Sequence, residues 1–190
     1  MKKTIGFALC GSFCTLRSAL TWLKPLTQDY DVLPIFSENT IHTDSRFGAA
    51  ADFATEVTEL CGRPPLTTLT QVEPLGPKKL LDLLVVAPCT GNTLGKLANG
   101  IADSAVTFAC KAHLRNSRPV VLAISTNDAL AASAENIGKL LVRKNYYFVP
   151  FGQDDWQNKP CSMVAHMEQL PETVAAALRG EQLQPLLRNY

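Results

Sequence analysis

Charged residues are scarce in this chain, at 18% of 190 residues, and neither sign dominates, because the formal net charge is +1. The basic residues are scattered, and their longest cluster is the pair Arg143 and Lys144. Proteins that bind a phosphate backbone need a basic face, so we expect no nucleic-acid partner. No apolar run approaches the roughly 18 residues of a membrane span, and the run after Lys3 is shorter than the roughly 7–15 residues of a signal h-region. The chain is therefore predicted to be cytoplasmic, without a membrane partner.

Motifs for metals, disulfides and hydrolytic catalysis are also missing. None of the six cysteines forms a Cys-x-x-Cys pair, which argues against zinc ribbons and thioredoxin-like redox motifs. No metal-ligand spacing, Ser/His/Asp arrangement or paired-carboxylate pattern stands out. Cys10, Cys89 and Cys110 sit in or beside apolar stretches, where a free cysteine behaves as a small buried hydrophobe. We expect no metal, and the catalytic residues stay unassigned.

The sequence does contain short apolar runs that alternate with amphipathic stretches. This alternation predicts βα units and an α/β fold, a Rossmann-like (flavodoxin-like) three-layer sandwich with a parallel sheet. The predicted strands are Thr4–Cys10, Val32–Phe36, Leu83–Ala87, Pro119–Ile124 and Tyr146–Val149. The predicted helices are Leu16–Gln28, Phe47–Cys61, Asn92–Ala98, Ser104–Arg115, Ala129–Lys144 and Met163–Leu178.

The length of the chain predicts a single domain over residues 1–190. Residues 62–79 contain four prolines and two glycines, so they are predicted to form an irregular connection. Residues 151–190 are predicted to form a loop followed by the C-terminal helix.

Ligands of an open parallel sheet bind at the carboxyl ends of its strands, so the loops there are the places to search. After the first strand, Gly11 permits a tight turn and Ser12 offers a hydroxyl beside a helix N-terminus, which favours an anion. After the third strand, PCTGNT runs from Pro88 to Thr93 and offers Asn92 and Thr93 as good N-cap residues, while Gly91 lets the backbone come close to a ligand. Two helix N-termini that face one crevice favour a phosphate, and ordinary capped turns remain the alternative.

Two further loops are polar. Ser125-Thr126-Asn127-Asp128 follows the fourth strand and suits either the polar edge of a planar substrate or a capped turn. The run FGQDDWQNKPCSM combines charged, amide and aromatic side chains without periodicity. Such a loop is typical of a lid, a partner surface or a plain surface excursion.

Taken together, the GS turn, Ser37 after the second strand and PCTGNTLGKLANGIADS resemble the homo-oligomeric flavin-containing cysteine decarboxylase family. That family carries a PASANT-type motif followed by a similar helical run. The resemblance implies a flavoprotein domain in which FMN is bound by Gly11, Ser12, Ser37, Pro88, Thr90, Asn92 and Thr93. It implies homo-oligomers, either trimers or dodecamers. We further expect Ser125 and Asn127 to face the flavin ring or the substrate.

The sequence also departs from that family. Its decarboxylases carry a catalytic histidine shortly before the third strand, where this chain has VEPLGPKKLLD with Pro74 at or near the equivalent place. Proline can neither transfer a proton nor donate a hydrogen bond. The substrate clasp PxMNxxMW matches ISTNDALA, which retains Asn127 but lacks the methionines and the tryptophan. Cysteine decarboxylation is therefore disfavoured, unless another base such as His42 serves.

A narrower resemblance covers essentially the whole chain. The runs EPLGPK, SRPVVLAISTNDAL and VPFGQDDWQNKPCSMVA are similar to the B-subunit family of bacterial dipicolinate synthases. This implies an oxidoreductase subunit that works with the A subunit of dipicolinate synthase to oxidise a dihydrodipicolinate-type precursor during sporulation, in the mother-cell cytoplasm. NAD(P) would enter only through the A subunit. The alternatives are a non-catalytic partner, whose pocket is vestigial or binds the dicarboxylate, and a cysteine-type decarboxylase.

Overall fold

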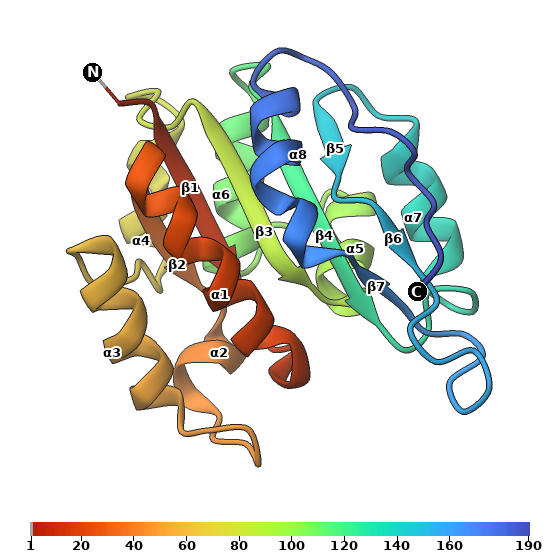
Figure 1. Cartoon of the computed structure of the whole chain (residues 1–190). Coiled ribbons are helices and arrows are strands. Elements are labelled where there is room, and N and C mark those ends of the chain that lie inside the picture. Colours follow the sequence, from red (N-terminus) through yellow and green to blue (C-terminus); the bar gives the residue numbers. More distant parts are fainter. Residues whose placement is uncertain (1) are drawn as a thin grey trace.

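The computed structural model describes residues 2–190 as a central sheet between two layers of helices (Figure 1). Within these residues the sheet has seven strands in the order β2-β1-β3-β4-β7-β6, with β5 paired to β4. The parallel strands are β1 (Thr4–Leu9), β2 (Asp31–Phe36), β3 (Leu83–Cys89), β4 (Val120–Thr126) and β5 (Tyr146–Phe148), and the antiparallel ones are β6 (Phe151–Gly152) and β7 (Met163–Ala165). The predicted α/β three-layer fold is confirmed.

Helices α1 and α8 cover one face of the sheet, and α5 and α6 lie behind it (Figure 1). The helices are α1 (Phe13–Asp29), α2 (Glu38–His42), α3 (Ala50–Cys61), α4 (Leu69–Val72), α5 (Gly91–Ala98), α6 (Ala105–Leu114), α7 (Ala134–Leu141) and α8 (Leu170–Ala177). Burial follows helical spacing in α1, where Leu16, Leu20, Leu23 and Leu26 face the sheet side.

The order of the parallel strands indicates where along the sheet a ligand is expected to bind. The chain leaves β1 for β2 on one side and then returns to β3 on the other side, so the direction of winding reverses between β1 and β3. All seven residues of β3 are buried, as expected for a strand covered on both faces. In such sheets the crevice at the carboxyl ends of the two strands that flank the reversal is the usual ligand site.

The helix predicted from Ala129 was too long. It begins only at Ala134, because residues before it form turns around Asp128. The Asp128 carbonyl accepts the backbone N–H of Ser133 at 3.1 Å, and its carboxylate accepts the Ser133 hydroxyl at 3.0 Å. These bonds give the backbone an alternative to the helix.

The prediction that a helix begins at Met163 was wrong. Met163–Ala165 is strand β7, which pairs with the end of β4 and with β6, and α8 begins at Leu170 with a proline in its first turn. The connection over residues 62–79 was predicted to be irregular, yet it contains α4, whose start is a capping box between Thr68 and Gln71. The prolines and glycines of this segment concealed that short helix.

The C-terminal tail lies along the outer strand β6. The backbone N–H of Phe151 donates to the Leu186 carbonyl at 3.0 Å, and the N–H of Arg188 donates to the Phe151 carbonyl at 3.1 Å. The ring of Tyr190 then stacks on His166 with 4.1 Å between ring centroids. The tail is therefore joined to this side of the sheet by an isolated parallel bridge between Phe151 and Leu187. Within residues 2–190, no helix has the length and apolar character needed to cross a membrane.

Candidate functional site

A side-chain contact joins the ends of β1 and β3, the two strands between which the direction of winding reverses. We call this place the switch point. The Thr93 hydroxyl, on the first turn of α5, donates to the Cys10 sulfur at 3.2 Å. Thr93 is 7% exposed, and its backbone N–H donates to the hydroxyl of the N-cap residue Thr90 at 3.3 Å. The loop after β3 is thus held against the loop after β1, where the sheet topology predicts a ligand.

A cavity of about 250 Å³ opens at this point. We call it the switch-point cavity, and its lining residues are Ser37, Glu38, Asn39, Thr90, Asn92, Thr93, Lys96, Asp103 and Ser104. Three of them are N-caps, because Ser37, Thr90 and Ser104 begin α2, α5 and α6, respectively. The structure therefore brings together four of the predicted cofactor residues, Ser37, Thr90, Asn92 and Thr93.

The other predicted cofactor residues lie around this cavity. Gly11 adjoins it, since a Cβ at Gly11 would lie 3.1 Å from the Cβ of Asn39. Pro88 is buried within β3 and does not line the cavity. Ser12 is not a lining residue either. Its hydroxyl takes part in a neighbouring hydrogen-bonded group.

That group consists of three hydroxyls from the ends of β1 and β4. The Ser12 and Ser125 oxygens lie 2.8 Å apart, and the Thr15 oxygen lies 2.9 Å from Ser12 and 3.0 Å from Ser125. Ser125 is buried, whereas Asn127 is exposed and its amide oxygen lies 3.5 Å from the Ser162 hydroxyl. The two predicted substrate residues therefore differ in their surroundings. Ser125 is hydrogen-bonded to Ser12, whereas Asn127 faces the loop before β7.

Gly91, in the middle of the PCTGNT run, is held in place by protein contacts. A Cβ at Gly91 would lie 2.7 Å from the hydroxyls of Ser133 and Thr126 and 2.8 Å from the Asp128 carboxylate. The sequence suggested that this glycine permits close approach to a ligand. The structure shows that the missing side chain allows the start of α5 to pack against the loop after β4, and close approach to a ligand stays a prediction.

The sequence prediction missed five lining residues that carry polar groups, Glu38, Asn39, Lys96, Asp103 and Ser104. The Lys96 ammonium lies 2.8 Å from one carboxylate oxygen of Asp103, and the hydrogen bond from Lys96 lowers the pKa of that carboxyl. Lys96 could have been found from its spacing in the sequence. It follows Asn92 by four positions and Thr93 by three, so the three residues share one face of the helix. Asp103 gave no such signal, since it lies in the connection between two helices.

The three histidines occupy different environments. His42 is exposed and borders a hollow of about 240 Å³ that shares Glu38, Asp103 and Ser104 with the switch-point cavity. His113 is buried in α6, where burial lowers its pKa to about 4. His166 is buried under Tyr190. Of the three, His42 therefore borders a hollow that shares lining residues with the candidate site.

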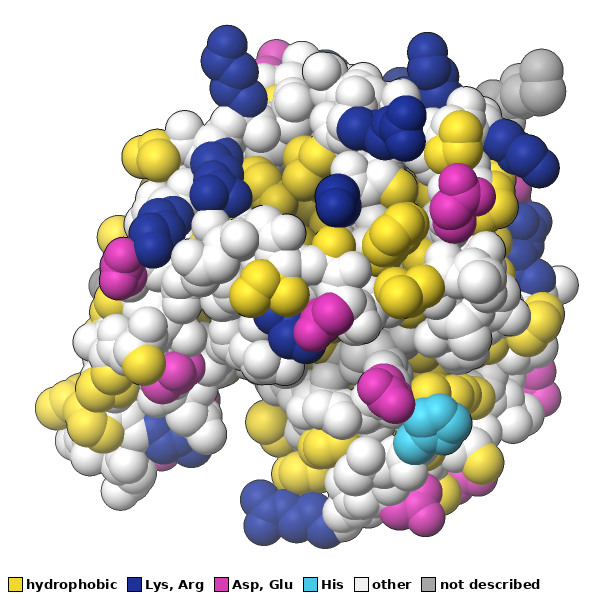
Figure 2. All heavy atoms as spheres, turned by 180° about the vertical axis from the view of Figure 1, so that it is seen from behind, with side chains coloured by type: hydrophobic (Ala, Val, Ile, Leu, Met, Phe, Trp, Pro, Cys, Tyr) yellow, Lys and Arg dark blue, Asp and Glu magenta, His cyan; other side chains and the backbone are white. Residues whose placement is uncertain are grey.

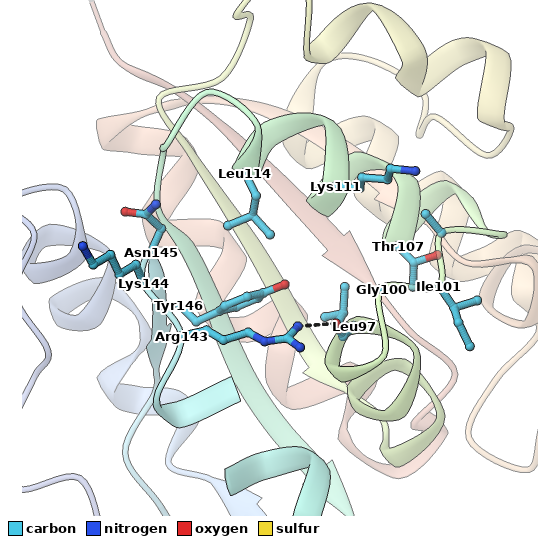
Figure 3. Close-up of a pocket in the computed structure, with 11 residues that line it drawn as sticks. Leu97, Gly100, Ile101, Thr107, Lys111, Leu114, Arg143, Lys144, Asn145 and Tyr146 are labelled. Carbon is cyan, nitrogen blue, oxygen red and sulfur yellow. Dashed lines mark hydrogen bonds between the residues drawn. The ribbon is translucent and has the colours of Figure 1, made fainter. Parts of the chain in front are cut away.

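A larger hollow, of about 370 Å³, lies on the rear face and contains none of the predicted residues. Figure 3 shows Leu97, Leu114 and Tyr146 around it, with Arg143 reaching across to the end of α5. The Arg143 guanidinium donates to the carbonyls of Leu97 and Ala98 at 3.1 and 2.7 Å. Tyr146 pairs with the first residue of β4, so this hollow lies away from the carboxyl edge of the sheet.

The carboxyl edge is bordered by a projecting loop. Figure 2 shows a notch in the lower outline, between the rest of the molecule and residues 153–161, which project at the lower right of Figure 1. Asp154 holds this loop together, because its carboxylate accepts the Ser162 hydroxyl at 2.7 Å and lies 3.1 Å from the Lys159 ammonium. The loop is therefore a compact projection beside the edge where Ser12 and Ser125 meet.

Comparison with known proteins decides the family. The model of the family described as Flavoprotein matches residues 1–178. The chain belongs to the flavoprotein family. This flavoprotein is 46% identical over 190 residues to the B subunit of dipicolinate synthase from Bacillus subtilis, covering 99% of the chain and 95% of the relative. The predicted resemblance to these B subunits is thereby confirmed.

Solved structures agree with the family. The structure of the dipicolinate synthase B subunit from Bacillus halodurans is 44% identical to this flavoprotein, with a TM-score of 0.90 over 100% of this chain and 99% of that one. A dodecameric FMN-dependent UbiX-like decarboxylase from Escherichia coli O157:H7 shares the fold at 21% identity, with a TM-score of 0.61 over 77% and 79% of the two chains. The same three-layer fold therefore occurs in proteins with different activities.

Proposed function

We propose that this flavoprotein binds FMN in the switch-point cavity and is the B subunit of a dipicolinate synthase. The observation that carries the proposal is the meeting of Ser37 with Thr90, Asn92 and Thr93, which come from two different strand ends, in one cavity. The similarity to the B subunit of the Bacillus subtilis enzyme supports the choice of this activity within the family.

The residues of the cavity fit a phosphorylated flavin. Hydroxyls of Ser37, Thr90 and Ser104 and the ammonium of Lys96 offer donors for phosphate oxygens. The carboxylates of Glu38 and Asp103 can accept hydrogen bonds from the hydroxyls of a ribityl chain. The absence of a side chain at Gly11 lets the loop after β1 lie close to Asn39 at the edge of the cavity.

When bound, the flavin supplies a two-electron acceptor for the oxidation of a dihydrodipicolinate-type precursor to pyridine-2,6-dicarboxylate. The residues of the chain bind and orient the reactants. The buried Ser125 fixes the loop after β4 through its hydrogen bonds with Ser12 and Thr15, and Asn127 on that loop presents an exposed amide suited to a substrate carboxylate. No proton-transfer residue is assigned.

The reaction further requires a partner. We propose that the A subunit of dipicolinate synthase supplies the nicotinamide cofactor, NAD(P), and that both proteins act in the mother-cell cytoplasm of a sporulating bacterium. The name of the relative, a B subunit, supports a two-subunit enzyme. We also propose a homo-oligomer, either a trimer or a dodecamer, and the dodecameric decarboxylase of the same fold supports this.

The proposal is tested by titrating the purified protein with FMN and following the quenching of flavin fluorescence. We expect micromolar or tighter binding, weakened by Thr93→Ala because the hydroxyl that joins α5 to Cys10 is lost. Thr93→Ser retains that hydroxyl and is the matched control. If Thr93→Ala binds FMN as tightly as the wild type, the cavity is not the flavin site.

Activity is tested in a system reconstituted from this chain and the A subunit. We expect dipicolinate formation to depend on both proteins and on flavin. Full activity of the A subunit without this chain would contradict a catalytic role and favour a non-catalytic partner whose pocket is vestigial or holds the dicarboxylate. Addition of dipicolinate to the flavin-free chain, followed by calorimetry, would distinguish those two cases.

A cysteine-type decarboxylase is the second candidate, because His42 borders a hollow that shares three lining residues with the switch-point cavity. This candidate predicts carbon dioxide release from a peptidyl or pantothenoyl cysteine, and the release is lost in His42→Gln. An inactive wild type in that assay, with flavin bound, rejects it.

A further inference from the structure

The charges around the switch-point cavity are unbalanced. Among the described lining residues Lys96 is the sole cation, and Glu38 and Asp103 are carboxylates. The two carboxylates repel a phosphate dianion, so any phosphate that enters depends strongly on the ammonium. Lys96 therefore supplies the positive charge on which phosphate binding in this cavity depends.

The geometry of Lys96 couples it to Asp103. The ammonium lies 2.8 Å from one carboxylate oxygen and 3.0 Å from the other. The side chain of Lys96 is 27% exposed, whereas that of Asp103 is 56% exposed, so the lysine is the more enclosed partner. An ammonium has three N–H donors, and a ligand phosphate competes with Asp103 for them.

The position of Lys96 on α5 directs it toward the ligand residues. It follows Asn92 by four positions and Thr93 by three, which places all three on one face of the helix. Asn92 and Thr93 line the same cavity, beside the hydroxyl of the N-cap Thr90. A phosphate held by these residues lies within reach of the ammonium.

We propose that Lys96 makes this cavity selective for phosphorylated flavin, and that Asp103 limits this selectivity by competing for the ammonium. The inference rests on the proposed function, since it concerns the flavin bound at the same site. Charge-assisted hydrogen bonds are roughly twice as strong as neutral ones, so the phosphate contact discriminates FMN from riboflavin. Neutral hydroxyl contacts to the ribityl chain are common to both flavins.

The test compares the dissociation constants of FMN and riboflavin for five proteins, the wild type and four variants. Lys96→Gln is expected to weaken FMN binding about tenfold and to leave riboflavin binding unchanged. Lys96→Arg retains the charge and is expected to retain the preference for FMN. Asp103→Asn is expected to strengthen FMN binding several-fold, because the competing charge is gone. Lys139→Gln is the matched control, since Lys139 forms a 2.7 Å pair with Glu135 on α7, away from the cavity lining.

The outcomes separate the two proposals. If Lys96→Gln weakens the binding of FMN and riboflavin equally, or weakens neither, the ammonium does not bind the phosphate. The inference is then overturned, while the proposal that the chain binds flavin stands. If the wild type binds neither flavin, whether or not the A subunit is present, both the proposed function and the proposed role of Lys96 are wrong. A structural role for the Lys96–Asp103 pair predicts that both variants lose stability, whereas phosphate selectivity predicts opposite changes in FMN affinity.

Discussion

The hydroxyl oxygens of Ser12 and Ser125 lie 2.8 Å apart, although 113 positions separate the two residues in the chain. Ser12 follows β1 and Ser125 lies near the end of β4, so the contact spans β3 at the carboxyl edge of the sheet. It fixes the distance between two loops that the proposed function assigns to flavin and substrate.

We expect a double-mutant cycle between these serines to show coupling. Ser12→Ala and Ser125→Ala should each lower the free energy of unfolding by about 1 kcal/mol, and the double variant should lose less than the sum. Urea denaturation measures all three. The Thr15 hydroxyl contacts both serines, so Thr15→Val is a further variant, and strict additivity among the three positions would contradict a shared hydrogen-bonded group.

Gly91→Ala is expected to destabilise the protein by about 1–3 kcal/mol. The added Cβ would lie within 2.8 Å of atoms of Ser133, Thr126 and Asp128, and these are held in place because the Asp128 carboxylate accepts hydrogen bonds from the other two side chains. Gly138→Ala is the control, because the space around Gly138 in α7 is open and alanine favours a helix by about 1 kcal/mol. Thermal unfolding should shift down for the first variant and up for the second.

Stability is expected to fall as the pH drops from about 6.5 toward 4. Burial lowers the pKa of His113 to about 4, so the folded state holds the ring neutral while the unfolded state binds a proton near the ordinary value. The loss is roughly 3 kcal/mol across this interval. His113→Gln should flatten the pH dependence of the melting temperature, whereas His42→Gln, at an exposed site, should not. Equal slopes in wild type and His113→Gln would contradict this assignment.

Gly152→Ala is expected to detach the C-terminal tail. A Cβ at Gly152 would overlap the Arg188 carbonyl oxygen, and the packed tail cannot accommodate it. Carboxypeptidase should then remove the last residues faster than in the wild type, while the cooperative unfolding of the sheet persists. Resistance equal to that of the wild type would show that the tail can shift without leaving β6.

Some of the site could be predicted from the sequence because its signals are local. Thr90 and Thr93 lie within one short run after an apolar strand, and the spacing of an N-cap and its partner is fixed by the helix. The parallel sheet also followed from the alternation of strands and helices. These features depend on neighbours in the chain.

Other features depend on distant residues, and the sequence concealed them. Met163–Ala165 reads as part of an amphipathic helix, yet it becomes a strand because Ser125 and Thr126 offer a free edge to pair with. Tertiary context here overrides local propensity. The meeting of Lys96 with Asp103 likewise depends on how the connection between α5 and α6 turns back.

The interior position of β1 has a consequence for biosynthesis. The strand at Thr4–Leu9 leaves the ribosome well before its second neighbour, Leu83–Cys89, because the two strands are far apart in the chain. Until then one edge of an apolar strand stays unpaired, and such edges recruit other chains. A nascent chain of this protein should therefore engage chaperones early and be released once β3 has docked.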